Sequence, residues 1–139
     1  MRVFLDSSTI IFGLEFKESN SSIVLDLLID KKFEGFASEK VLEEVRRYFS
    51  RRRGKNYAYL TVKVLKNNLK IIFRSEIEES IRKWKGKIKE KDLEHLAVVK
   101  GKGIEILVAY DQDFQPFGEY MTPKQFVESM GLTPFETDF

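Results

Sequence analysis

The chain has 139 residues, a net charge of +2, one histidine and no cysteine. This length fits one domain with its own hydrophobic core, so we expect a single domain over residues 1–139. The missing cysteines exclude disulfides, a thiol nucleophile and a Cys-ligated metal, and one histidine excludes a multi-histidine metal site. The sequence has no membrane-length apolar run and no secretory signal, which predicts a cytoplasmic protein without a membrane partner.

Apolar periodicity predicts short strands that alternate with helices. The strands are expected at residues 3–5, 33–37, 69–73, 104–109 and 119–121, and the helices at 7–16, 22–30, 38–51, 57–67, 76–85, 90–100 and 123–130. The strands are short apolar runs without polar alternation, which is typical of a parallel sheet covered on both faces. Right-handed crossovers place the carboxyl ends of such strands at one edge, where ligands bind in these folds.

Acidic residues directly follow two of the predicted strands. Asp6 comes after the first strand, and Asp111 and Asp113 come after the fourth. In a parallel sheet these three carboxylates lie at the same edge. Each also has a simpler interpretation, because Asp6 could cap the following helix and the other two could be ordinary turn residues.

Two predicted helices add one acid each. At about 100° per residue, Glu44 lies beside the apolar stripe of the helix at 38–51, whereas Glu43 points into solvent. Asp92 flanks the apolar stripe of the helix at 90–100 near its start, whereas Glu94 faces away. Taken alone, Glu44 could be a solvated helix residue and Asp92 could serve only the helix dipole.

The candidate site therefore groups five acids, namely Asp6, Glu44, Asp92, Asp111 and Asp113. Neighbouring carboxylates repel one another and would take up protons unless a cation lies between them. With carboxylate ligands and no cysteine or histidine set, Mg²⁺ or Mn²⁺ is the expected cation. One or two such ions can activate a water and stabilise the leaving oxygen of a phosphodiester, so the predicted chemistry is metal-assisted hydrolysis.

Four segments of the chain, in order, resemble one known family. They are VFLDSSTII, SEKVLEEVRRY, KDLEHLAVVKGKGIEILVAYDQDF and YMTPKQFVE. They are similar to the strand–Asp–Ser/Thr start, the Ser-x-x-x-Leu-x-Glu helix, the Asp-bearing helix with its Asp-x-Asp strand end, and the Thr-Pro-x-x-Phe helix of the PIN domain family. The resemblance covers almost the whole chain and is to PIN domains of the kind found in VapC toxins and related archaeal proteins.

The resemblance implies an α/β/α sandwich with a five-stranded parallel sheet, and a Mg²⁺- or Mn²⁺-dependent ribonuclease, usually an endonuclease. It also implies that Ser8 hydrogen-bonds within the site, that a toxin of this kind would have a cognate antitoxin chain, and that the chain forms a homodimer. Ala109 departs from the family, which often has Thr or Ser there, and the lost hydroxyl is expected to weaken the positioning of water or phosphate. The implied metal ligands are Asp6, Glu44, Asp92 and Asp111, with Asp113 in an auxiliary role.

The densest basic cluster follows Glu44 along the same predicted helix and into the next loop. It consists of Arg46, Arg47, Arg51, Arg52, Arg53 and Lys55. One interpretation is a phosphate track that leads RNA into the acidic site. The other is a solvated helix end whose cations suit the helix C-terminus.

Two further side chains and one other function stay open. His95, one turn after Asp92, could be a general base, but a place at the surface or behind the metal ligands is favoured. Trp84 either anchors its helix to the core or lies in a dimer contact. A non-catalytic PIN-like module that binds RNA or protein is the main alternative, motivated by Ala109 and the modest net charge. An aspartyl phosphatase fits poorly, because its Asp-x-Asp pair should follow the first strand, whereas here the pair follows the fourth. A serine hydrolase also fits poorly, because the sequence has no Gly-x-Ser-x-Gly elbow.

Overall fold

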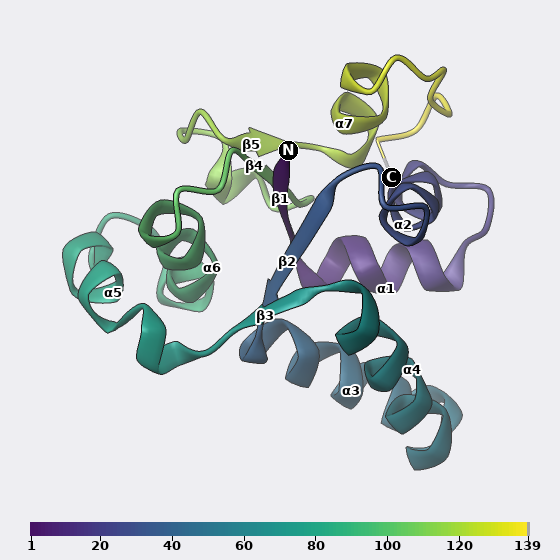
Figure 1. Ribbon diagram of the computed structural model, residues 1–139, viewed down its shortest axis with the longest axis horizontal. Helices are drawn as coiled ribbons and strands as arrows, with labels where there is room; N and C mark the ends of the chain where they lie inside the picture. Colours follow the sequence, from purple (N-terminus) through teal and green to yellow (C-terminus); the bar gives the residue numbers. More distant parts are fainter. Residues whose placement is uncertain (139) are drawn as a thin grey trace.

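The computed structural model describes residues 1–138, which form five strands, seven α-helices and two short 3₁₀ turns (Figure 1). Every helix in this part of the chain is too short or too polar to cross a membrane. The elements, in chain order, are β1 (Arg2–Leu5), α1 (Ser7–Glu15), α2 (Asn20–Ile29), β2 (Glu34–Ser38), α3 (Glu39–Arg53), α4 (Lys55–Asn68), β3 (Lys70–Ile72), η1 (Arg74–Glu76), α5 (Glu78–Trp84), α6 (Glu90–Gly101), β4 (Ile106–Val108), η2 (Gln112–Phe114), β5 (Tyr120–Met121) and α7 (Pro123–Ser129).

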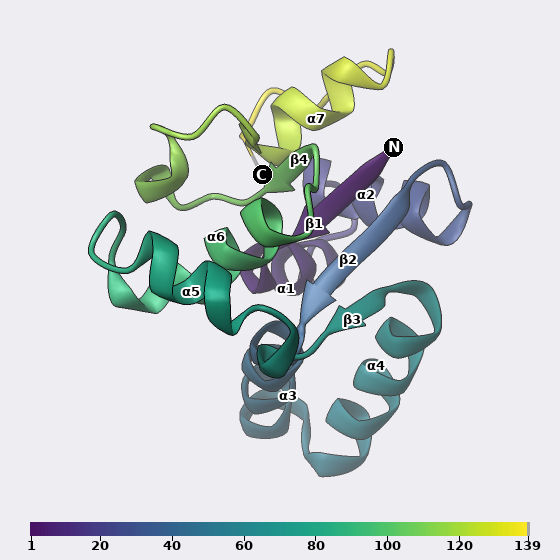
Figure 2. The same cartoon turned by 60° about the vertical axis from the view of Figure 1, so that its left-hand side comes forward.

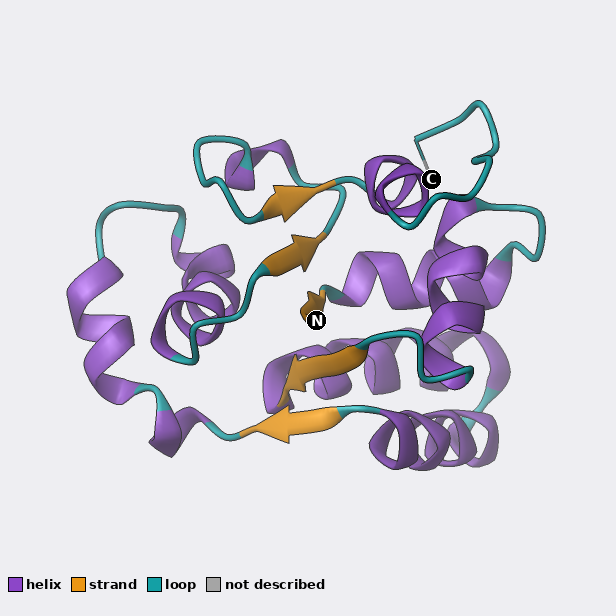
Figure 3. Ribbon diagram, turned by 45° about the horizontal axis from the view of Figure 1, so that its top comes forward, coloured by secondary structure: helices purple, strands orange, loops and turns teal. Residues whose placement is uncertain are grey.

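The strands form one parallel sheet in the order β3-β2-β1-β4-β5. Helices α5 and α6 pack together on one face, whereas α1, α2 and α7 form the layer on the other face, with α3 packed against α1 (Figures 1 and 3). The strand residues are mostly buried, because both faces of the sheet are covered. The predicted α/β/α sandwich with a five-stranded parallel sheet is therefore confirmed.

Most element boundaries lie within about two residues of the predicted ones. Gly54 separates α3 from α4 with a φ of 90°, a left-handed conformation that glycine adopts without strain. The helix expected from residue 76 begins at Glu78, because the 3₁₀ turn η1 comes first. The strand expected at 104–109 is limited to Ile106–Val108, because only these residues pair with β1.

Helix α6 departs from the prediction, because it is buried on nearly every side. All residues from Asp92 to Val99 are buried, since the sheet covers one face of α6 and α5 packs against another. Glu94, which was predicted to face away from the core, is buried, and its Oε1 lies 2.7 Å from Nη1 of Arg74 in η1. The assignment of Glu94 to a free outer face was therefore wrong.

The sheet order reverses at β1, because the chain runs outward from β1 to β3 and then returns to β4 on the other side. The carboxyl ends of β1 and β4 lie side by side, since the Asp6 N–H donates to the Val108 carbonyl at 3.1 Å. In open parallel sheets this reversal point is where the loops part and a ligand can reach the strand ends. Asp6 and Asp111 follow the two strands that meet there.

Candidate metal centre

Asp6 is both the cap of a helix and the centre of the acidic site. Its Oδ1 accepts a hydrogen bond from the Ser7 N–H at 2.8 Å, and this bond caps the start of α1. Its Oδ2 accepts a hydrogen bond from the Ser8 hydroxyl at 2.9 Å. The side chain is buried. Burial alone would raise the pKa of Asp6, but the hydrogen bonds from His95, Ser8 and Ser7 outweigh it and lower the pKa below the usual value. Asp6 is therefore held as a carboxylate inside the protein.

His95 supplies the cation for this part of the site. Its Nε2 lies 3.1 Å from Asp6 Oδ1 and 3.4 Å from Glu44 Oε1, and the ring is buried against Phe4. Burial alone would lower the pKa of His95, but the two carboxylates outweigh it and raise the pKa to about 9. The imidazole is therefore positively charged at neutral pH. A surface position for His95 is wrong, because the ring lies among the acids.

Glu44 reaches the site from α3, as its place beside the apolar stripe predicts. Its Oε1 accepts the Ser7 hydroxyl at 3.2 Å, and its side chain keeps 43% of its surface exposed. The neighbouring Glu43 turns outward to Arg46 and Arg47. Glu44 thus forms the rim of the site, between the buried Asp6 and solvent.

Asp92, Asp111 and Asp113 form a second group with a different balance of charge. Asp92 is buried, and among the described residues its Oδ2 has no hydrogen-bond donor. Burial, together with the charge of Asp111, raises the pKa of Asp92 to about 6. Lys91 is the nearest cation, and its exposed Nζ lies 2.8 Å from Asp111 Oδ2 but 3.9 Å from Asp92 Oδ2. This group therefore holds a buried carboxylate whose charge is incompletely balanced.

Asp111 and Asp113 are held by the turn after β4. The Asp113 N–H donates to Asp111 Oδ1 at 2.9 Å and fixes the start of η2. Against the effect of burial, this bond and the one from Lys91 lower the pKa of Asp111. Asp113 itself pairs with Lys89 at 3.2 Å. Both residues are thus turn residues, as their sequence context allows, and members of the acidic group at the same time.

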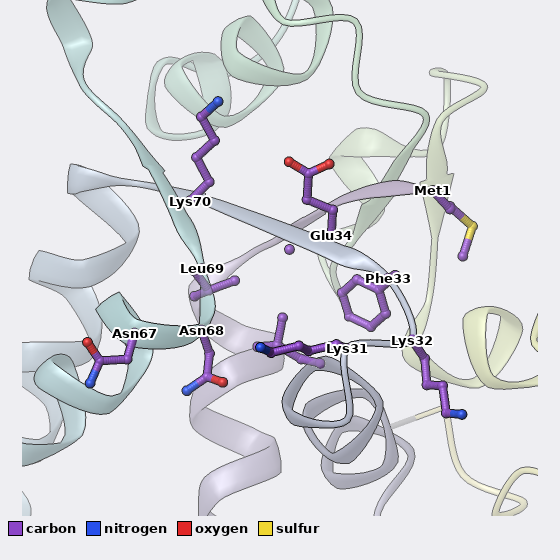
Figure 4. A pocket seen from close by; sticks show the side chains of 11 residues that line it. Met1, Lys31, Lys32, Phe33, Glu34, Asn67, Asn68, Leu69 and Lys70 are labelled. Atoms are coloured by element: carbon purple, nitrogen blue, oxygen red, sulfur yellow. The ribbon is translucent and has the colours of Figure 1, made fainter.

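Four of the five acids line one hollow of about 410 Å³ at the carboxyl edge of the sheet. A larger hollow, of about 580 Å³, lies at the opposite edge and is drawn in Figure 4. Its charged lining consists of Lys31, Lys32, Glu34 and Lys70, so it offers one carboxylate and no acidic pair. The hollow that suits a divalent cation is the smaller one, which is lined by Asp6, Ser7, Ser8, Glu44, Lys91, Asp92, His95, Tyr110 and Asp111.

The donor set of this hollow fits a hard divalent cation. In the described part of the chain, carboxylate oxygens of Asp6 and Glu44 lie within 4.8 Å of each other, and so do those of Asp92, Asp111 and Asp113. Carboxylate oxygens suit Mg²⁺ and Mn²⁺, and the Asp92 oxygen without a donor is an open ligand position. The four acids that line the pocket would hold the ion, namely Asp6, Glu44, Asp92 and Asp111. Asp113 lies beside them, because its N–H donates to Asp111.

The structure brings together all five predicted acids and Ser8, but it leaves the arginine-rich cluster farther away. Arg52 and Arg53 bind Glu15 at the end of α1, whereas Asp6 caps the start of that helix. Arg51 lies seven residues after Glu44, about 10 Å along the helix axis. Arg46 and Arg47 pair with Glu43 on the outer side of α3, and Lys55 begins α4.

Sequence reasoning missed three side chains of the hollow, namely Ser7, Lys91 and Tyr110. One signal was available, because each of the three stands directly beside a predicted acid in the sequence. The partner of His95 could not be predicted, because Asp6 lies 89 residues away in the sequence and meets it only through packing.

The fold and site define an α/β domain with a carboxylate cluster at the reversal point of a parallel sheet. A family model described as PIN domain matches residues 2–113. The chain belongs to the PIN domain family. No curated protein matches its sequence.

Solved structures of similar fold include chains of toxin–antitoxin complexes. A chain of VapBC2 from Rickettsia felis, bound to a DNA fragment from the promoter, is 16% identical with a TM-score of 0.69, covering 88% of this chain and 97% of that one. VapC20 of Mycobacterium tuberculosis, described as a sarcin-ricin loop cleaving toxin, is 22% identical with a TM-score of 0.63, covering 84% and 95%. A chain of VapBC-1 from nontypeable Haemophilus influenzae is 12% identical with a TM-score of 0.67, covering 89% and 99%.

Proposed function

We propose that this chain is a Mg²⁺- or Mn²⁺-dependent endoribonuclease that hydrolyses RNA phosphodiester bonds at the acidic hollow. The observation that carries the proposal is the convergence of Asp6, Glu44, Asp92 and Asp111 on one pocket, with an Asp92 oxygen left without a donor. Membership of the PIN family supports it. The carboxylates repel one another, and Asp92 keeps an oxygen without a donor although His95 and Lys91 face the site, so a bound cation would add stability.

The residues around the hollow have separable tasks in this proposal. Asp6, Glu44, Asp92 and Asp111 would hold the metal, which when bound supplies an activated water and neutralises charge on the phosphodiester. Ser8 and the Ser7 N–H orient the Asp6 carboxylate. His95 keeps Asp6 and Glu44 near each other from behind. Asp113 would act as an auxiliary, because its N–H orients Asp111.

We further propose that the chain is the toxin of a toxin–antitoxin pair and has an antitoxin partner. The support is the likeness to chains of VapBC complexes and of a toxin–antitoxin complex from Klebsiella pneumoniae. A homodimer is also proposed, on the family resemblance alone. Light scattering of the purified chain, with and without a partner co-expressed from an adjacent reading frame, tests both proposals.

For the substrate side, Ser8 and the arginine-rich cluster remain proposed phosphate contacts. Ser8 lines the hollow itself. Of the arginine-rich cluster, Arg51 and Lys55 are the members without a carboxylate partner in the described part of the chain, because the other four pair with Glu43 or Glu15. Within this cluster, these two cations are therefore the most available to an RNA phosphate.

The test is cleavage of end-labelled structured RNAs by the purified chain with Mn²⁺, with EDTA and the Asp92→Asn variant as controls. The panel includes a sarcin-ricin loop hairpin, because one similar structure is described as a toxin that cleaves that loop. Metal-dependent fragments that disappear in the variant support the proposal. Fragments of equal yield in EDTA or in the variant contradict it.

A non-catalytic binding module is the second candidate. It is favoured by the cations that already face each acidic group, His95 in one and Lys91 in the other. It predicts no change in melting temperature with millimolar Mn²⁺, because a metal that does not bind cannot stabilise the folded state. The melting experiment therefore separates it from the nuclease.

A further inference from the structure

The segment from Arg82 to Lys91 connects α5 to the start of α6 and is the second dense group of cations in the chain. It reads RKWKGKIKEK and contains one acid, Glu90. Lysine stands at every second position from residue 83 to residue 91, and all of these lysines are exposed. We call residues 82–91 the lysine-rich segment. Its cations lie on the surface, so their charge is available to a partner.

Most of these cations lack a carboxylate partner, unlike those of the arginine-rich cluster. In residues 1–138, Arg82, Lys83, Lys85 and Lys87 form no ion pair, whereas Lys89 and Lys91 pair with the site itself. In the arginine-rich cluster, four of the six cations are already paired with Glu43 or Glu15. A cation that is already paired gains less from a phosphate, because the ion pair must first be broken.

Trp84 of the lysine-rich segment belongs to an aromatic pair. The Trp84 ring is half-buried and packs edge-on against Phe117, which belongs to the loop after η2, with 6.1 Å between ring centroids. The ammonium groups of Lys83, Lys87 and Lys100 lie 5.1–5.9 Å from the Trp84 ring centre. An aromatic ring surrounded by lysines is the combination that binds an unpaired base together with its phosphates.

The lysine-rich segment is continuous with the acidic hollow. Lys89 Nζ lies 3.2 Å from Asp113 Oδ2, and Lys91 Nζ lies 2.8 Å from Asp111 Oδ2. Figure 2 shows the connection between α5 and α6 at the outer edge of the molecule, on the same side as the loop that follows β4. Trp84 precedes Lys89 by five residues, a span of at most about 18 Å. A strand bound over Trp84 could therefore continue into the site.

We propose that the lysine-rich segment, with Trp84 and Phe117, is a binding surface for single-stranded RNA that leads into the acidic hollow. The inference rests on the proposed nuclease function and names the surface that binds its substrate. RNA fits better than an acidic protein, because alternating lysines around a flat indole match a strand of phosphates and bases. The surface is charged enough to attract phosphate although the whole chain carries only +2.

The first test measures binding alone. A labelled oligouridylate of about twelve nucleotides, within the usual site size of about 4–16, is titrated in EDTA so that no cleavage can occur. The double variant Lys85→Gln with Lys87→Gln should bind more weakly. At about 0.1 M salt, the affinity should fall about fivefold for each phosphate that the variant no longer neutralises. The variant should also flatten the slope of log affinity against log salt by about 0.7 for each such phosphate.

Two control pairs have the same change in charge. Lys31→Gln with Lys32→Gln lies at the opposite edge of the sheet, beside the hollow of Figure 4, and should leave the affinity unchanged. Arg51→Gln with Lys55→Gln removes the unpaired cations of the arginine-rich cluster and should have a smaller effect than the lysine pair. An equal loss of affinity in the first control would show unspecific charge attraction, and a larger loss in the second would place the RNA on α3. Either result overturns the proposal.

The second test uses the wild-type chain, so it does not depend on the folding of a variant. Trp84 is the only tryptophan, and its fluorescence should be quenched when a base stacks on it. Oligouridylate should quench, whereas heparin, which carries charge without bases, should bind without the same quenching. Binding of oligouridylate without quenching overturns the role of Trp84. Equal binding and quenching by polyglutamate overturns the choice of RNA in favour of an acidic protein.

These measurements separate the surface from the chemistry. If no RNA is cleaved with Mn²⁺ but the lysine pair still controls oligouridylate binding, the nuclease proposal fails and the binding surface stands. If RNA is cleaved but the lysine pair changes neither affinity nor the salt slope, the nuclease stands and the surface proposal is overturned.

Discussion

The two acidic groups of the metal centre differ in how their charges are balanced. Asp6 accepts hydrogen bonds from Ser7 and Ser8 and lies 3.1 Å from Nε2 of the buried, charged His95, so the fold itself balances the charge of this carboxylate, although His95 Nδ1 has no partner among the described residues. Asp92 is just as buried, but its Oδ2 has no donor among the described residues, and its nearest ammonium lies 3.9 Å away. One group is therefore part of the folded architecture, whereas the other is left for a cation to complete. Substitutions in the two groups should then differ in stability even where they agree in activity.

The largest expected effect is on cleavage, where both groups should respond alike. Substitution of a residue that only supports a metal ligand lowers activity by roughly 10–100-fold. Asp6→Asn and Asp92→Asn each remove a proposed ligand itself, so each should lower the cleavage rate with Mn²⁺ by more than that. Single-turnover cleavage of an RNA identified in the panel measures this. Asp26→Asn, on the exposed side of α2, is the matched control and should cleave normally. Full activity in either site variant would contradict the assignment of that residue.

The stability of the same two variants should move in opposite directions without metal. Asp6→Asn leaves the His95 imidazolium facing only Glu44. It should lower the free energy of unfolding by about 2–3 kcal/mol, somewhat less than breaking a fully buried pair does. Asp92→Asn removes a buried carboxylate whose Oδ2 has no donor, and should stabilise the chain by about 1 kcal/mol. Thermal melts in EDTA measure both, at about 4 °C per kcal/mol for a chain of this size. Shifts of the same sign would mean that the two groups are balanced alike.

The acids of the site were predictable from the sequence, whereas their charge balance was not. Asp6 and Asp111 follow apolar strands, and Glu44 lies one step off an apolar stripe, so periodicity and topology alone place them at one edge. The burial of His95 against Phe4 of β1 and the contact of Glu94 with Arg74 of η1 depend on packing between elements, which a pattern within one helix does not contain. The pairing of Arg52 and Arg53 with Glu15 was hidden for a related reason, because Glu15 lies in a different helix.

Metal binding should depend on the incomplete group more than on the completed one. Mn²⁺ at ten times its dissociation constant should stabilise the wild-type chain by about 1.4 kcal/mol. Asp92→Asn should lose most of this shift, because it removes the carboxylate that lacks a donor. Glu43→Gln, an acid on the outer side of α3 that binds Arg46 and Arg47, should keep it. A Mn²⁺ shift that survives in Asp92→Asn would place the ion on the other group.

The smallest effect isolates Lys91, the cation that now faces the incomplete group. Its ammonium lies 2.8 Å from Asp111 and is exposed, so a metal ion must compete with it for that carboxylate. Lys91→Gln should tighten Mn²⁺ binding by about two- to fivefold, which corresponds to the roughly 0.5–1 kcal/mol of an exposed ion pair. Lys40→Gln is the matched control, because Lys40 donates to the Lys91 carbonyl and contacts no acid of the site. Titrating Mn²⁺ by its thermal shift compares the two variants. Weaker Mn²⁺ binding in Lys91→Gln would mean that this lysine organises the carboxylates for the ion and does not compete with it.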